Sequence, residues 1–136
     1  MTVQRLSPGG MMPAVPYAHV AVATGTRQVH VAGQVARTAD GQPVATGDLA
    51  GQVAHVVRAT ARGLTAAGAR YDDVVRLTFY VAGWEPEHIG PFMAGIEAVA
   101  EEVGLPSPLP PASVIGVAAL FEADVLVELE ATAVLD

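Results

Sequence analysis

The chain has 136 residues, of which 51% are hydrophobic, and it contains no cysteine. A chain of this length can form one hydrophobic core without disulfide bonds, so we treat residues 1–136 as a single domain. Arg and Lys residues number 7 and Asp and Glu residues 14, which gives a net charge of −7. An acidic chain without a basic stripe is a poor ligand for the phosphates of nucleic acid, so we expect no nucleic-acid partner.

The charge is unevenly divided along the chain. All 7 cations are Arg, the last of them is Arg76, and 10 of the 14 acids follow it. No apolar run reaches the roughly 18 residues that a membrane span needs, and the N-terminal segment lacks the basic start and apolar stretch that are typical of a secretory signal. We therefore expect a cytoplasmic protein that does not bind membranes.

The first half of the chain predicts two strands and a helix. Val-rich runs at 17–23 and 28–34 flank a short turn and are typical of a β-hairpin. Apolar residues then recur at helical spacing over 49–64. Asp48 is a candidate N-cap and Gly68 a candidate stop signal for this helix.

The second half predicts a strand, a second helix and two further strands. β-branched and aromatic residues at 74–82 favour a strand. Pro91 suits the first turn of a helix that ends at Gly104. A stiff proline-rich connection then leads to strands near 113–120 and 125–134. This order predicts an α+β fold in which a single mixed sheet carries both helices on one face.

The last predicted strand alternates between two kinds of side chain. Val127 and Leu129 lie on one side, whereas Glu128, Glu130 and Thr132 lie on the other. The second face of the sheet is thus only partly hydrophilic. Because the chain has more apolar residues than usual, we expect a homo-oligomer that covers this face.

The histidines do not form a recognisable metal motif. None of the 4 histidines stands in an HxH, HxxxH or HExxH spacing, and zinc sites normally need three or four converging ligands. His19 and His30 would lie on opposite faces of the predicted hairpin. His55 shares a side of the first helix with Gln52, away from Leu49, and is expected to be exposed to solvent. The sequence therefore predicts no metal and no cofactor.

Two carboxylates remain as candidates for chemistry. Glu128 and Glu130 lie on one strand face, about 7 Å apart at the rise of a strand, and such a pair can supply a general acid or base. The alternative is that both lie on an exposed face or pair with Arg across a subunit contact. The residues alone leave both interpretations open.

Five ordered segments resemble the Rid superfamily, also called YjgF or RidA-like and in older usage L-PSP endoribonuclease. The resemblance covers about 16–134 and rests on the ordered set, since each piece alone is common. The segments are Pro-Tyr-Ala-His at 16–19, Val-His-Val-Ala-Gly-Gln at 29–34, a helix with Gln52 that closes in Ala-Ala-Gly-Ala at 66–69, Asp-Val-Val-Arg-Leu-Thr-Phe-Tyr-Val at 73–81, and Val-Glu-Leu-Glu-Ala-Thr-Ala at 127–133.

The resemblance implies a chorismate-mutase-like α+β subunit that forms a homotrimer, with small-molecule clefts between subunits. The best-known members hydrolyse reactive enamine and imine intermediates, such as 2-aminoacrylate, to keto acids and ammonia without a cofactor. On this basis we expect a small-molecule ligand, a homotrimer, and a cofactor-independent hydrolase or deaminase-like activity.

The resemblance also assigns residues of the cleft. Glu128 matches the residue that orients water or exchanges a proton, and it is the candidate catalytic residue. Tyr17 and the backbone of Gly33 match positions that orient the ligand. Ala32 stands where a Ser is often found, and Met93 or a neighbour replaces an Asn.

The chain departs from the family at the wall of the cleft. In deaminating members an Arg after a Pro-Ala step grips the substrate carboxylate as a bidentate fork, and here Ala112 takes that position. The resemblance implies that the segment 110–113, which includes Ser113, shapes the wall of the cleft. Since no cation follows Arg76, a replacement has to come from the first half of this chain or of a neighbouring one. A cleft lined by Ala32, Met93 and Ala112 is expected to prefer a larger or less anionic ligand.

We therefore expect a divergent family member that binds an imine, enamine or related carbonyl metabolite and processes it by hydrolysis or deamination. A trimer that senses a metabolite or binds a protein without catalysis is the alternative. Ordinary 2-aminoacrylate deaminase activity is less favoured because the Arg is missing. Ribonuclease action is less favoured because it rests on the older family label alone.

Overall fold

The computed structural model describes residues 3–136 and contains six strands and two α-helices. The helices are α1 (Leu49–Ala66) and α2 (Ile89–Val103), and short 3₁₀ turns span Tyr71–Asp73 and Pro86–His88. No helix within the described residues has the length and hydrophobicity to cross a membrane. The strands are β1 (Val3–Leu6), β2 (Val20–Ala23), β3 (Arg27–Gln34), β4 (Val74–Ala82), β5 (Ala112–Val117) and β6 (Val127–Leu135).

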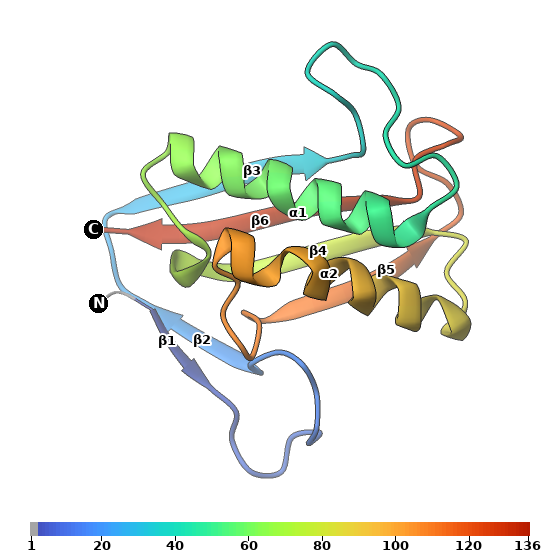
Figure 1. Cartoon of the computed structure of the whole chain (residues 1–136). Helices are drawn as coiled ribbons and strands as arrows, with labels where there is room; N and C mark the ends of the chain where they lie inside the picture. The colour runs from blue at the N-terminus through green and yellow to red at the C-terminus, as the bar shows by residue number, and fades with distance from the viewer. Residues whose placement is uncertain (1–2) are drawn as a thin grey trace.

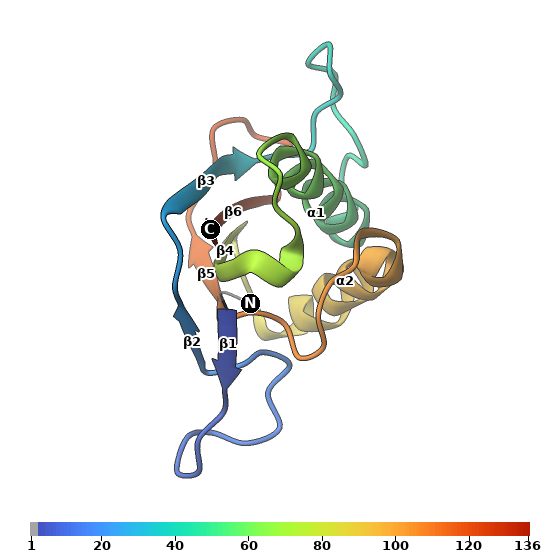
Figure 2. The same ribbon diagram turned by 90° about the vertical axis from the view of Figure 1, so that its left-hand side faces the viewer.

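The main sheet has four strands in the order β3, β6, β4, β5. β6 is antiparallel to both of its neighbours, whereas β4 and β5 are parallel. Both helices cover one face of this mixed sheet, and the described residues leave most of the other face uncovered (Figures 1 and 2). The prediction of an α+β fold with two helices on one face of a mixed sheet is confirmed.

The predicted hairpin between 17–23 and 28–34 is wrong. β2 pairs with β1, which the sequence interpretation did not include, and these two strands form a separate small sheet. β3 pairs instead with β6. β6 has 9 residues and can pair along most of the 8 residues of β3, whereas β2 has only 4. The predicted placement of His19 and His30 on opposite faces of a hairpin loses its basis.

The predicted helix ends and the strand at 74–82 are confirmed. The Asp48 side chain caps α1 by accepting a hydrogen bond from the N–H of Gly51 at 3.0 Å. α1 ends just before Gly68, whose φ of 79° is in the left-handed region that glycine tolerates. α2 ends at Gly104 in the same conformation, with φ of 70°. β4 spans the predicted residues.

The hydrophobic core lies between the helices and the sheet. Alternate residues of the central strands point toward the helices and are almost completely buried, which removes their apolar surface from water. α1 and α2 pack closely, since a Cβ at Gly95 would lie 2.5 Å from the carbonyl oxygen of Ala50. The buried strand residues are Leu77, Phe79, Val81, Val127, Leu129, Ala131 and Ala133.

The side of α1 that was expected to face solvent is covered by loops. Gln52 is completely buried. Its side-chain N–H groups donate to loop carbonyl oxygens, including that of Asp124 at 3.0 Å, and its oxygen accepts from the N–H of Leu126 at 2.9 Å. His55 is half-buried, and its Nε2 lies 2.9 Å from the carbonyl oxygen of Arg37. The prediction that His55 is exposed to solvent is wrong.

Candidate functional site

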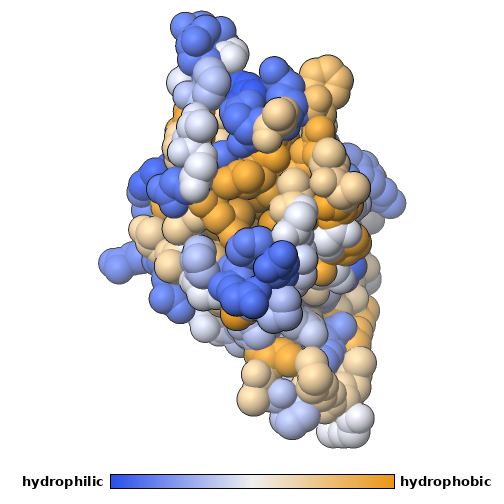
Figure 3. Space-filling model, turned by 90° about the vertical axis from the view of Figure 1, so that its right-hand side faces the viewer, coloured by the Kyte–Doolittle hydropathy of each residue, from blue (hydrophilic) through white to orange (hydrophobic). Residues whose placement is uncertain are grey.

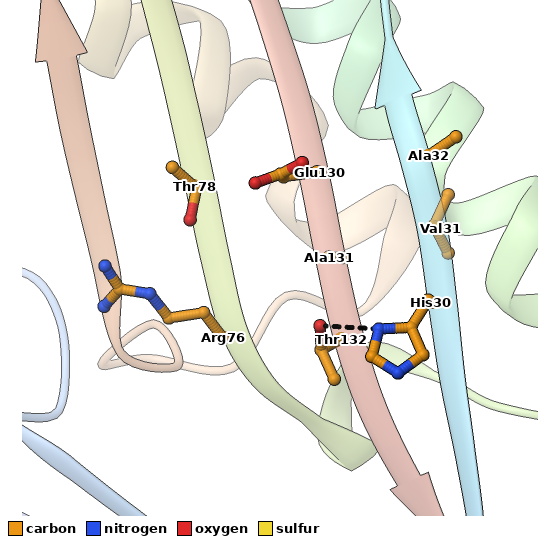
Figure 4. A pocket seen from close by; sticks show the side chains of 8 residues that line it. All are labelled: His30, Val31, Ala32, Arg76, Thr78, Glu130, Ala131 and Thr132. Carbon is orange, nitrogen blue, oxygen red and sulfur yellow. Dashed lines mark hydrogen bonds between the residues drawn. The ribbon is translucent and has the colours of Figure 1, made fainter.

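The sheet face that points away from the helices, here called the open face, carries most of the polar side chains of the sheet. Strand alternation places these residues opposite the buried core residues. Figure 4 shows several of them around a cavity of about 360 Å³. The polar residues of the open face are His30, Arg76, Thr78, Tyr80, Ser113, Glu128, Glu130 and Thr132.

Glu128 and Gly33 lie against each other on the open face. β3 carries a bulge, because the three steps from Val31 to Gln34 match two steps on β6. An extra residue of this kind changes the direction of the neighbouring side chains. The Glu128 carboxylate occupies the space that a Cβ at position 33 would need. A residue without a side chain at position 33 is therefore what allows this carboxylate to lie against β3.

Glu130 has a different partner. The hydroxyl of Tyr80 donates a hydrogen bond to Glu130 Oε1 at 2.9 Å. This hydrogen bond raises the pKa of Tyr80 above its ordinary value, and burial and the negative charge of Glu130 act in the same direction. Within residues 3–136, ion pairs with Arg involve other acids than Glu128 and Glu130. The two carboxylates of the predicted pair thus have separate environments.

An apolar cavity of about 470 Å³ lies beside α2 and the start of β5. Tyr17, Met93, Ala112 and Ser113, which were predicted to line a cleft, all contribute to it, together with Phe79 and Phe92 among others. Figure 3 looks at the end of the molecule where both helices begin and shows apolar side chains gathered there. The lining of the apolar cavity suits the hydrocarbon part of a small molecule.

Backbone hydrogen bonds hold Tyr17 at this cavity. The N–H of Ala18 donates to the carbonyl oxygen of Leu109 at 2.7 Å, and the N–H of Leu109 donates to the carbonyl oxygen of Pro16 at 2.9 Å. The ring of Tyr17 also contacts the ring of His19 edge to face, with 5.4 Å between centroids. The proline-rich connection after α2 is therefore what positions the N-terminal segment.

Within one chain the predicted site residues fall into separate groups. Tyr17, Met93, Ala112 and Ser113 line the apolar cavity, whereas Gly33 and Glu128 meet on the open face. Ala32 lines the polar cavity of Figure 4, together with residues that include Arg76 and Glu130. Within one chain, the Glu128 carboxylate is therefore not part of the apolar cavity.

Arg76 is a site residue that the sequence identified only as the last cation. Its Nη2 donates to Ser113 Oγ at 2.6 Å, so a side chain of the polar cavity reaches a residue of the apolar one. The signal available in the sequence is strand alternation, which places Arg76 on the same face as Thr78 and Tyr80. The contact with β5 also depends on the parallel pairing of β4 with β5, which the sequence does not specify.

The histidines of the described residues take part in local hydrogen bonds. His19 Nε2 lies 2.7 Å from the carbonyl oxygen of Met12. His30 contacts the side chains of Gln28 and Thr132, at 3.0 Å and 3.4 Å. Residues 3–136 contain no group of three or more His, Asp or Glu side chains arranged to hold a metal ion.

Comparison with known proteins gives one family. A sequence model described as Endoribonuclease L-PSP matches residues 9–135, and no curated protein matches the chain. Among solved structures, YyfB of Yersinia pestis, described as a protein of unknown function of the conserved Rid family, has 37% identity and a TM-score of 0.87, with 99% of this chain and 100% of that chain covered.

Two further structures are similar in fold. Rv2704 of Mycobacterium tuberculosis, described as a member of the YjgF/YER057c/UK114 family, has 29% identity and a TM-score of 0.60, covering 98% of this chain and 100% of that chain. The YjgF gene product of E. coli has 24% identity and a TM-score of 0.68, covering 96% and 98%. At 24% identity, the likeness to the E. coli YjgF gene product concerns the fold alone.

Proposed function

Because the chain belongs to the Rid family, the group that the Endoribonuclease L-PSP model describes, we propose that it binds a small imine, enamine or related carbonyl compound and hydrolyses the C=N bond. The family membership predicted from the ordered motifs is confirmed by the match over residues 9–135. The observation that carries the proposal is the Glu128 carboxylate held against Gly33 on the open face.

We place the reaction in clefts between copies of the chain. The apolar wall and the carboxylate lie in separate groups within one chain, and the open face also exposes an apolar side chain, Ile115, which is 42% exposed. A second copy packed on the open face would bring its own Tyr17 and Met93 toward the Glu128 of its neighbour. The family resemblance favours three copies, arranged so that each cleft takes residues from two of them.

In the proposed reaction Glu128 moves protons between water and nitrogen. The water oxygen bonds to the imine carbon, the electron pair of the C=N bond moves to nitrogen, and Glu128 takes the proton that water loses. Glu128 returns this proton to nitrogen and then carries the remaining hydroxyl proton there as the C–N bond breaks. The products are a carbonyl compound and ammonia. An enamine first becomes the imine by losing a proton from nitrogen and gaining one at carbon, and then follows the same course.

The other residues of the cleft hold the ligand. Tyr17 and the backbone of Gly33 orient it, and the segment 110–113 shapes the wall beside it. Since water supplies the oxygen atom and Glu128 moves the protons, the proposed reaction uses no cofactor. The ligand partner is a small molecule, and we propose neither a membrane nor a nucleic acid as a partner.

The test compares two neighbouring carboxylates of the open face. Imines are generated in the assay from leucine or phenylalanine by an amino-acid oxidase, and the release of keto acid is followed with and without the protein. We expect Glu128→Gln to lower kcat/KM by about 100-fold or more, whereas Glu130→Gln, the matched control, changes it little. Full turnover by Glu128→Gln would exclude the proposed role of this carboxylate.

Two further measurements separate this proposal from its alternatives. Size-exclusion chromatography with light scattering should give three times the chain mass of 13.9 kDa. Ligand binding by the wild type without any turnover would favour a metabolite sensor instead. RNA should not be retained at low salt, because residues 77–136 contain acids and no cation.

A further inference from the structure

Arg76 stands at the boundary between the two cavities. It projects from β4 on the open face and lines the polar cavity (Figure 4). Its Nη2 donates to Ser113 Oγ at 2.6 Å, and Ser113 lines the apolar cavity. The pairing of Thr78 with Ser113 across the parallel strands explains this contact, because Arg76 lies two residues before Thr78 on the same strand face.

The Arg76 guanidinium has hydrogen-bond donors to spare. Arg37 forms a bidentate ion pair with Asp124, and Arg58 forms one with Glu102. The ion pairs among residues 3–136 do not include Arg76. A guanidinium offers five N–H donors in a planar fork that matches a carboxylate, and Ser113 accepts from only one nitrogen.

The open face gives a further reason to expect an anion here. A copy of the chain that covers this face would remove Arg76 from water, and a buried charge without a partner is strongly unfavourable. The Glu130 carboxylate lines the same cavity, but it accepts a hydrogen bond from Tyr80. An anion bound near Ser113 would use the free donors of Arg76 on the side of the β5 strand.

We propose that Arg76 binds the carboxylate of the ligand, while the apolar cavity takes the ligand's side chain. This inference rests on the proposed function and names Arg76 as the residue of this chain that takes the ligand's carboxylate in place of the missing Arg. Ser113 is a positioning residue, because its hydroxyl holds the guanidinium at the boundary of the two cavities. Arg76 on β4 thus supplies the guanidinium that is missing at Ala112. The proposed ligand is therefore an anion, whereas the sequence led us to expect a less anionic one.

The experiment compares a charged probe with a neutral one of nearly the same shape. Binding of 2-oxohexanoate and of its methyl ester is measured by calorimetry. The wild type should bind the acid at least about 10-fold more tightly than the ester. Arg76→Gln should remove this preference by weakening acid binding alone. Arg62→Gln, which removes an exposed Arg of α1, should retain the preference.

Two milder variants keep the test decisive if Arg76→Gln does not fold. Arg76→Lys keeps the charge without the planar fork and should give an intermediate preference. Ser113→Ala should weaken acid binding by a few-fold, because it frees the guanidinium to move. Circular dichroism and light scattering of each variant report the fold and the assembly.

The outcomes separate this inference from the proposed function. An unchanged preference in Arg76→Gln, equal binding of acid and ester by the wild type, or no binding of 2-oxohexanoate would overturn the role of Arg76. Glu128→Gln should lower kcat/KM for imine hydrolysis by about 100-fold or more and still bind 2-oxohexanoate. If Arg76→Gln loses acid binding while Glu128→Gln keeps full turnover, the carboxylate site stands and the proposed catalytic role of Glu128 fails.

Discussion

The two faces of β6 differ although their residues alternate along one strand. Toward the helices, Val127, Leu129 and Ala133 have no exposed surface. Toward the open face, Glu128 is half-buried and Glu130 exposed. The helix-side face is completed by α1 and α2 of the same chain, whereas the open face has its polar groups arranged but not covered. The residues on the helix side of β6 thus stabilise the fold, and those on the open face are available for chemistry.

Hydrogen bonds organise the open face without closing it. Tyr80 donates to Glu130, and Arg76 donates to Ser113. These contacts set the directions of the side chains and leave donors of Arg76 and oxygen atoms of Glu128 available for a ligand. Substitutions on the helix side should therefore change the free energy of unfolding, and substitutions of Glu128 or Arg76 on the open face should change turnover or binding.

The largest expected effect is that of Leu129→Ala. Leu129 is completely buried, and its truncation should lower the free energy of unfolding by about 3 kcal/mol through lost burial and a cavity. Glu130→Gln, the matched change one residue along, should leave the urea midpoint within error. Both are compared at one protein concentration, because assembly contributes to the apparent stability. Equal losses in the two variants would mean that the open face is part of the stabilising core.

A smaller loss is expected for Gln52→Ala. Gln52 holds the loop between β5 and β6 through Asp124 and Leu126, and its removal leaves buried backbone groups without partners. We expect a loss of about 2 kcal/mol in urea unfolding. Gln28→Ala, which removes an exposed glutamine of β3, is the control and should be close to neutral. A neutral Gln52→Ala would show that water replaces the side chain.

The elements that could be predicted from the sequence have local signals. Asp48 can cap a helix within one turn, and Gly104 can end one with a single left-handed residue. The alternation of apolar and acidic residues predicted the two faces of β6, because a strand places successive side chains on opposite sides. These signals need no knowledge of the rest of the fold.

The elements that could not be predicted depend on distant segments. The turn after β2 allows a hairpin, but β6 offers β3 a longer partner about 100 residues later in the chain. The helical pattern of α1 predicts a buried stripe, but it does not show that loops will cover Gln52. For the site, Tyr17 and Met93 were expected in one cleft and line one cavity, whereas the reach of Arg76 to Ser113 requires the pairing of β4 with β5.

The pH dependence of stability tests the loop that Gln52 anchors. Arg37 hydrogen-bonds to Asp124 and lowers the pKa of that carboxyl below its ordinary value, despite an opposing contribution from burial. Because the folded-state pKa is the lower one, the unfolded chain binds more protons in acid. The stability that this pair contributes is therefore present above the ordinary Asp pKa of about 4 and is lost as the pH falls through the folded value.

Asp124→Asn should reduce stability at pH 7 and differ less from the wild type at pH 2 to 3. The control is Glu102→Gln, which removes the pair with Arg58. That pair is more exposed, with 45% and 54% of the side chains accessible against 14% and 28% for Arg37 and Asp124, so solvent screens it more strongly. Urea unfolding across pH measures both variants. A difference between Asp124→Asn and the wild type that stays constant with pH would assign the loss to packing.

Apart from the control variants, Gly33→Ala is expected to change the stability least. The atoms in the way of a new Cβ belong to the Glu128 side chain, which can rotate, so the free energy of unfolding should fall by no more than about 1 kcal/mol. The carboxylate must leave β3, however, and turnover of imines should fall by about 10-fold or more. Gly95→Ala is the helix-side counterpart, and because its Cβ would meet the backbone of Ala50, it should destabilise the protein more. Gly33→Ala with full turnover would show that the position of Glu128 against β3 is not the reactive one. Comparing the unfolding free energy and the turnover of the two glycine variants then separates the effect of packing on the helix side from the effect on chemistry at the open face.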